Sequence, residues 1–127
     1  MSDKFIVEII SPEQTILKQE TKEVIIPSFE GQMGILKNHI PLITFLRPGI
    51  VTIKTENEKK YYVEEGTVEF SNNNLLILTS TARDLANLNK NKINELLQKA
   101  EANLNTQSTD KERYVASYKL ETLKEIS

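Results

Sequence analysis

The sequence predicts a mainly β protein with added α-structure: an N-terminal antiparallel β-sandwich followed by a C-terminal α-helical hairpin. All four glycines and all four prolines lie at or before Gly66, so the last 61 residues contain neither of these two turn-forming residues. Up to about residue 81, short β-branched or aromatic runs alternate with such turns, whereas from about residue 88 apolar residues recur at helical spacing. We therefore expect a sandwich over residues 1–84 and a two-helix domain, mobile in our interpretation, over residues 85–127.

Eight β-strands are expected in the sandwich, because each run ends at residues that favour chain reversal. They cover residues 5–10, 15–18, 23–26, 42–46, 50–55, 60–64, 67–70 and 75–79. Adjacent strands should pair as antiparallel hairpins. Residues 75–78 are continuously apolar, which predicts a strand that is covered on both faces.

The segment 31–42, GQMGILKNHIPL, combines two glycines, the only histidine and a proline. Glycine permits backbone conformations closed to other residues, and proline fixes its own φ. We interpret this segment as a preorganised turn between strands that docks onto a partner. Some of its apolar side chains must face the core instead, and the sequence leaves open which ones.

Two helices are expected after the sandwich. The first carries one apolar stripe, at spacings i, i+3, i+4, i+7 and i+11. This stripe consists of Ile93, Leu96, Leu97, Ala100 and Leu104. Residues 105–108 interrupt the pattern, and Thr109 followed by Glu112 has the spacing of a capping box, which predicts the start of a second helix.

Composition excludes several classes of function. A net charge of −2 provides no basic surface for nucleic acid, and a chain with no cysteine and one histidine cannot build a zinc or thiolate site. No segment approaches the roughly 20 apolar residues that span a bilayer, and the first residues lack the apolar run of a signal peptide. We expect no catalytic residue, no cofactor and no metal.

Catalysis by a histidine is the weaker interpretation. His39 is the only usual general base, and no GxSxG motif surrounds a serine. Glu64 and Glu65 are adjacent, so their side chains should diverge, and a solvated surface explains them better than an acid–base pair. Two alternatives nevertheless stay open: a non-catalytic β-sandwich interaction module of another assembly, and a small enzyme that uses His39 with a carboxylate such as Glu30.

The order of motifs resembles a known family. The run VEIISPEQTILKQETKEVIIPSFEGQMGILKNHIPLITFLRPGIV, residues 7–51, resembles the epsilon subunit of bacterial F-type ATP synthase. Its glycine-rich segment, His-x-Pro-Leu and later Pro-Gly occur in that order in the family. The resemblance continues through residues 62–66 and 79–82 and into the two helices, so it covers essentially the whole chain.

The resemblance implies a non-catalytic central-stalk subunit of the F1 sector that couples the rotor to the catalytic head. In the family, the sandwich binds the gamma subunit and contacts the c-ring, partly through the segment that matches residues 30–42. The matching residues here are Glu30, Gly31, Gln32, Met33, Gly34, His39, Pro41 and Leu42. Gln32 replaces a glutamate of some relatives, which implies a neutral contact. The membrane is reached only through the complex, at the cytoplasmic face of the bacterial inner membrane.

The helical hairpin of the family can swing from a folded state on the sandwich to an extended state. The extended hairpin enters the head, contacts the alpha and beta subunits and inhibits ATP hydrolysis. Some relatives bind ATP through Ile/Leu-Asp-x-x-Arg-Ala, but the corresponding positions here are Leu88, Asn89, Lys92 and Ile93. The carboxylate and the guanidinium fork are both replaced, so ATP sensing is not expected. The candidate inhibitory contacts, Lys111, Arg113, Lys119 and Lys124, are balanced by Asp110, Glu112, Glu121 and Glu125. We therefore expect modest or absent inhibition.

Overall fold

The computed structural model describes residues 3–106 and 109–127. Within these residues, ten β-strands precede two α-helices, which confirms the predicted fold class. The strands are β1 (Phe5–Ile10), β2 (Thr15–Thr21), β3 (Glu23–Ser28), β4 (Gly31–Leu36), β5 (Leu42–Leu46), β6 (Gly49–Lys54), β7 (Lys59–Val63), β8 (Gly66–Ser71), β9 (Asn74–Leu78) and β10 (Arg83–Asp84). A 3-10 turn, η1 (Leu85–Asn87), leads into α1 (Lys90–Thr106) and α2 (Asp110–Ile126).

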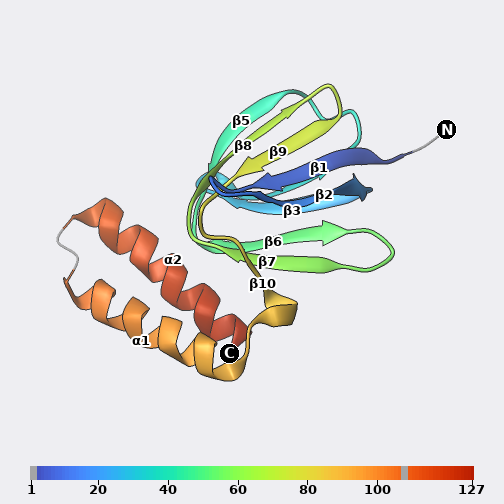
Figure 1. The fold of residues 1–127 in the computed structure, drawn as a ribbon. Coiled ribbons are helices and arrows are strands. Elements are labelled where there is room, and N and C mark those ends of the chain that lie inside the picture. The colour runs from blue at the N-terminus through green and yellow to red at the C-terminus, as the bar shows by residue number, and fades with distance from the viewer. Residues whose placement is uncertain (1–2, 107–108) are drawn as a thin grey trace.

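The strands form one sheet that folds over on itself, in the order β10-β7-β6-β3-β5-β8-β9-β1-β2, with β4 added beside β3 (Figure 1). The two layers join where β3 meets β5, through the pair Ser28 and Leu46. The expected antiparallel hairpins are present at β1–β2, β6–β7 and β8–β9. Strand β1 differs from expectation on its other side, because it pairs with β9 in parallel.

Apolar side chains alternate inward along the strands to build the sandwich core. In β1, for example, Phe5, Val7 and Ile9 are buried, and the residues between them are half-buried. Phe5 packs edge-on against Phe70, with 5.6 Å between the ring centroids. This period of two is the signal by which the sequence predicts the strands.

Strand β4 corrects the expectation of a turn over residues 31–42. Gly31–Leu36 pairs with β3 along its whole length, and its tight turn lies one step earlier, at Phe29 and Glu30. Gly31 has φ of 121°, which favours glycine at the exit of that turn. Ile35 is completely buried. The short β10, beyond residue 81, was also not expected.

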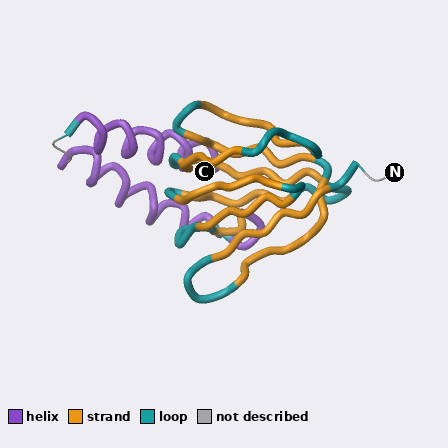
Figure 2. Tube along the Cα trace, turned by 90° about the horizontal axis from the view of Figure 1, so that it is seen from above, coloured by secondary structure: helices purple, strands orange, loops and turns teal. Residues whose placement is uncertain are grey.

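The helices lie beside one end of the sandwich (Figure 2). They pack against the outer face of β6 and β7, where Ile50 and Tyr62 contact helix residues. Tyr62 of β7 points away from the sandwich core and packs in a second core with Leu96, Ala100 and Leu123. The expected double coverage of residues 75–78 was wrong. Leu75 and Ile77 are buried in the core, but Leu78 is 44% exposed on the outer face.

Both helices begin at capped positions. The Thr109 hydroxyl accepts a hydrogen bond from the Glu112 amide at 3.1 Å, which confirms the predicted start of α2. The Asn89 side chain accepts from the Lys92 amide at 2.8 Å at the start of α1. The expected break at 105–108 was wrong for Asn105 and Thr106, which are helical, and residues 107–108 lie outside the described residues.

Candidate functional site

The predicted partner interface is divided between the two ends of the sandwich. Phe29, next to Glu30, stacks on Tyr114 of α2 with 6.0 Å between ring centroids, so this turn lies at the helical end. The loop that carries His39 and Pro41 follows β4 at the opposite end. A six-residue strand spans roughly 17 Å between first and last Cα, so Glu30 and His39 belong to different patches.

The remaining predicted interface residues divide between surface and interior. Gln32 and Gly34 are exposed on β4, and Pro41 is exposed in the following loop. Met33 and Leu42 are half-buried and pack against the sandwich core. The apolar side chains that stay available to a partner in this segment are instead Leu36, 55% exposed, and Ile40, 74% exposed.

His39 has structural contacts. Its Nδ1 lies 2.7 Å from the carbonyl oxygen of Ile40, and its ring packs edge-on against Phe70 at 5.9 Å between centroids. Glu30 has a different partner, because its Oε1 accepts from the Thr44 hydroxyl at 3.4 Å. The two residues therefore do not form the acid–base pair that the enzymatic alternative requires. Within the described residues, no cluster of three or more metal-binding side chains occurs.

A largely apolar groove of about 1020 Å³ lies between the sandwich and α2. It includes Phe29, Phe45, Leu46, Leu78 and Val115. Phe45 is 60% exposed and Leu78 is 44% exposed, and Ile43, two residues before Phe45 on the same outer face of β5, is 70% exposed. Contiguous exposed apolar surface of this kind marks a site of protein contact.

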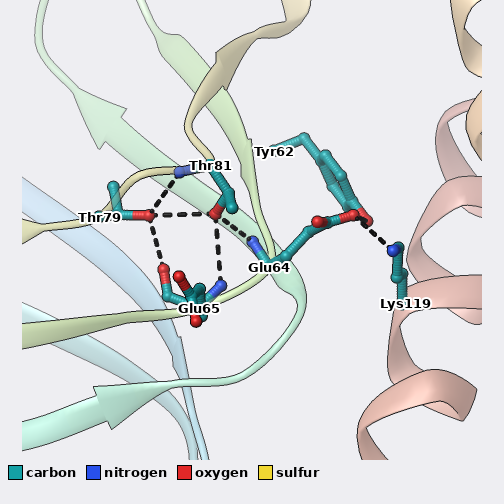
Figure 3. Close-up of polar contacts among 6 residues, drawn as sticks. All are labelled: Tyr62, Glu64, Glu65, Thr79, Thr81 and Lys119. Atoms are coloured by element: carbon teal, nitrogen blue, oxygen red, sulfur yellow. Dashed lines mark hydrogen bonds and ion pairs between the residues drawn. The ribbon is translucent and has the colours of Figure 1, made fainter. Parts of the chain in front are cut away.

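A cluster that the sequence analysis missed fastens α2 to the sandwich. Lys119 Nζ lies 3.1 Å from Glu64 Oε2, and the Tyr62 hydroxyl donates to the same oxygen at 2.9 Å (Figure 3). Both members of the ion pair are largely buried, at 21% and 26% side-chain exposure. We call Tyr62, Glu64 and Lys119 the helix latch. Glu64 was expected on the solvated surface, and that expectation was wrong.

Burial, together with Glu64 of the latch, favours the neutral form of Tyr62. Burial raises the pKa of the Tyr62 hydroxyl far above its usual value, and the charge and hydrogen bond of Glu64 raise this pKa further, while the Arg83 charge opposes the shift.

Two further contacts join α2 to the sandwich beside the latch. The Arg47 guanidinium lies 4.1 Å above the centre of the Tyr118 ring, and the Thr122 hydroxyl donates to the Pro48 carbonyl oxygen at 3.4 Å.

Two threonines fix the chain where it leaves the sandwich towards the helices. The Thr79 hydroxyl donates to the Glu65 carbonyl oxygen at 2.6 Å, and the Thr81 hydroxyl oxygen accepts from the Glu64 amide at 2.9 Å (Figure 3). The Glu65 carboxylate accepts from Ser80 at 3.0 Å. Glu64 and Glu65 thus diverge as predicted, although they lie in the turn after β7.

The candidate contacts with the head and the positions that match the nucleotide motif of some relatives have different surroundings in this arrangement. Lys111 and Lys124 are exposed on α2, as is Arg113, whereas Lys119 is held in the latch. Of the positions that match the nucleotide motif, Lys92 forms an ion pair with Glu95 at 3.7 Å. Leu88 packs in the core beneath the helices, Ile93 is 9% exposed, and Asn89 caps α1.

Comparison with known proteins places this architecture in a family. The family model described as "ATP synthase, Delta/Epsilon chain, beta-sandwich domain" matches residues 4–84. A relative named ATP synthase epsilon chain, from Pelagibacter ubique, is 47% identical over 130 aligned positions that cover all of both chains. The chain belongs to the ATP synthase delta/epsilon family.

This membership confirms the family resemblance and the function it implies at the level of the subunit. The chain is an epsilon-type, non-catalytic subunit of an ATP synthase. The fold agrees with two solved structures. A chain of the Euglena gracilis mitochondrial ATP synthase, in a structure of OSCP, F1 and c-ring, has a TM-score of 0.76 at 23% identity, covering 98% of this chain and 79% of that one.

The second solved structure is of the Tetrahymena thermophila mitochondrial ATP synthase central stalk and c-ring. Its matching chain has a TM-score of 0.68 at 15% identity, with 94% of this chain and 93% of that one covered. At these identities the likeness concerns the fold alone. Among the described residues, neither α1 nor α2 is long and apolar enough to cross a membrane.

Proposed function

We propose that this epsilon-type chain acts in the central stalk of a proton-translocating ATP synthase, where it joins the gamma subunit to the c-ring. The full-length 47% identity to a bacterial ATP synthase epsilon chain carries the proposal. The same relative supports a peripheral location at the cytoplasmic face of a bacterial inner membrane. The membrane is then reached only through the other subunits.

The surface of the sandwich suits this role. A stalk piece that transmits torque needs a stiff body with apolar contact areas, since flexible parts pay an ordering cost on docking. The sandwich core is continuous and fully buried at Val7, Val24 and Ile77, whereas Ile43 and Phe45 stay exposed on the outer face. We assign this outer face, with the groove beside α2, to the gamma subunit. The loop at the far end, which carries His39 and Pro41, is assigned to the c-ring.

The two helices are proposed to be a separate, mobile domain over residues 85–127. In the docked arrangement the latch occupies Lys119, so this residue is free to contact the alpha and beta subunits only after the helices leave the sandwich. The charges of α2 balance, which favours weak inhibition of ATP hydrolysis. Deleting residues 105–127 should therefore change the hydrolysis rate of the assembled enzyme little, and a strong rise would contradict this part of the proposal.

Purification of a tagged chain from its own cells tests the stalk assignment. Alpha, beta, gamma and c subunits should be recovered together with it. The Phe45→Glu substitution places a charge on the outer face and should reduce recovery of gamma, whereas Asn57→Glu, on the exposed turn after β6, should not. Recovery of a different assembly, or of none of these subunits, would refute the proposal.

A further inference from the structure

The exit linker, residues 79–84, leads from β9 to the helices and is held on the turn that carries Glu64 of the latch. The Thr81 hydroxyl oxygen accepts from the Glu64 amide at 2.9 Å (Figure 3). Further along the linker, Arg83 of β10 pairs with Tyr62 of β7. The linker is therefore bound to both latch members that the sandwich supplies.

The two linker threonines have their hydroxyl hydrogens fixed by their partners. The Thr79 hydroxyl donates to the Glu65 carbonyl oxygen at 2.6 Å, so its single hydrogen is used there. The Thr81 hydroxyl is then the donor in the 3.1 Å contact between the two hydroxyl oxygens. The two lone pairs of the Thr81 oxygen accept from the Glu64 amide and, at 3.4 Å, from the Glu65 amide. This connected network fixes the backbone of the turn.

Glu64 is consequently held from two sides. Its amide is bound by Thr81 of the exit linker, whereas its carboxylate oxygen Oε2 is bound by Lys119 of α2 and by Tyr62. A carboxylate on a loose backbone would have to be ordered each time α2 docks, and a fixed backbone removes part of that entropic cost. Through Lys119, the helical domain thus contacts the same residue to which its own linker is fastened.

We propose that Thr81 is a positioning residue for the helix latch, so that the exit linker and the latch open as one cooperative unit when the helices leave the sandwich. The inference rests on the proposed mobility of the helices and adds the residue that couples their linker to their docking. Such coupling is reciprocal: loss of the Thr81 hydroxyl should favour undocked helices, and loss of Lys119 should free the Glu64 amide from Thr81. A threonine that held the turn equally in both states would leave docking unchanged when removed.

Hydrogen exchange of the full chain measures the first direction. Thr81→Val removes the hydroxyl, and the α2 amides that open with undocking should exchange about fivefold faster, which corresponds to the typical net contribution of one hydrogen bond. Thr81→Ser keeps the hydroxyl and should retain the rate of the unaltered chain. Thr55→Val is the matched control, because the Thr55 hydroxyl accepts from the Asn57 amide at 3.2 Å in the turn at the other end of β7. It should leave α2 exchange unchanged.

The reverse direction is measured at the Glu64 amide. In Lys119→Met, the exchange of this amide should rise by the same factor as that of the α2 amides, while the amides of the β1–β9 pair keep their rates. In the Lys119→Met background, Thr81→Val should change α2 exchange by less than about twofold, because the latch that it positions is already lost.

Two results would overturn the inference: equal α2 exchange in Thr81→Val and Thr55→Val, or a fivefold effect of Thr81→Val that persists in Lys119→Met. If the α2 amides of the unaltered chain exchange only through global unfolding, the proposal of mobile helices fails instead. The cycle is then measured as the free energy of unfolding in urea, where non-additivity of Thr81→Val and Lys119→Met supports the positioning of Glu64 by Thr81 and additivity refutes it.

Discussion

The helix latch should set how firmly the helices stay on the sandwich, and Lys119→Met tests this directly. Methionine keeps an apolar stem of similar length, so the change removes the charge with little loss of packing. Exposed ion pairs contribute about 0.2–1 kcal/mol, whereas breaking a fully buried pair costs about 3–5 kcal/mol. With side-chain exposures of 21% and 26%, the Lys119–Glu64 pair lies between these cases.

A value of about 2 kcal/mol is therefore expected for the loss of docking free energy, or roughly a thirtyfold change in the ratio of docked to undocked helices. The Tyr62 hydroxyl still donates to Glu64 Oε2 in the variant, which keeps the loss below the buried limit. Undocked helices of this length are marginal in water, so their amides should exchange once they leave the sandwich.

Hydrogen exchange of the α2 backbone amides measures this opening. Under native conditions the exchange of amides that open with undocking should become roughly thirtyfold faster in Lys119→Met, while amides of the β1–β9 pair should keep their rates. Lys111→Met is the control, because Lys111 is an exposed residue of the same helix with no ion pair among the described residues. Equal exchange in Lys119→Met and Lys111→Met would refute the reasoning.

Three further changes should give measurable effects. The pKa of Tyr62 is raised in the folded chain, so the folded chain holds this proton more tightly than the unfolded chain does. The stability that this group provides below pH 10 should therefore be lost as the pH rises above 10. Denaturant titrations between about pH 8 and 11 should show the free energy of unfolding falling with pH, and Tyr62→Phe should reduce that slope. Gly49→Ala would place a Cβ 2.5 Å from Pro27 Cβ, and it should lower the free energy of unfolding by about 1–3 kcal/mol in urea titrations, with an unchanged value arguing against this contact. Thr109→Ala removes the cap of α2 and should cost about 1 kcal/mol, seen as a lower thermal midpoint of the helical circular dichroism signal, whereas Thr109→Ser should retain it.

The strands were predictable wherever one side of the sheet faces the core, because period-two burial is written directly in the sequence. Strand β4 was missed since its glycines at 31 and 34 suggest a turn, and only pairing with β3 shows that the exposed Gly34 is compatible with a strand. Tertiary pairing thus overrode the local propensity of this segment.

Continuous apolar runs were ambiguous for a different reason. The runs at residues 61–63 and 75–78 look alike in sequence, yet Tyr62 is completely buried under the helices and Leu78 is 44% exposed. A run of this kind indicates only that apolar side chains stand on both faces of the strand. The run does not indicate whether the residues that pack over each face belong to the same chain or to a partner. The outward apolar residues of β9 are not covered by this chain, and they are part of the surface that we propose for the gamma subunit.

The latch could not be predicted because Lys119 lies far in sequence from Tyr62 and Glu64. A lysine or a glutamate taken by itself is most simply interpreted as an exposed surface residue. The adjacent apolar pair Tyr61 and Tyr62 was the available signal, since it implies that both faces of β7 are covered. Tyr61 faces the sandwich core and Tyr62 faces the helices. A polar group on a buried Tyr62 then requires a partner nearby, and Glu64, two residues later on the same side, supplies it.

The separation of the two cores has a consequence for how the helices are held. The sandwich core is closed by residues from the strands. In the core beneath the helices, Tyr62 is the one completely buried strand residue among those that the structure describes. Undocking the helices would therefore leave the sandwich core intact and would expose chiefly the outer face of β6 and β7. The docked arrangement depends on burial of a few large side chains, each contributing about 1.5–3 kcal/mol, and on the latch. Such local contacts support the proposal that the two helices form a separate, mobile domain on a rigid sandwich.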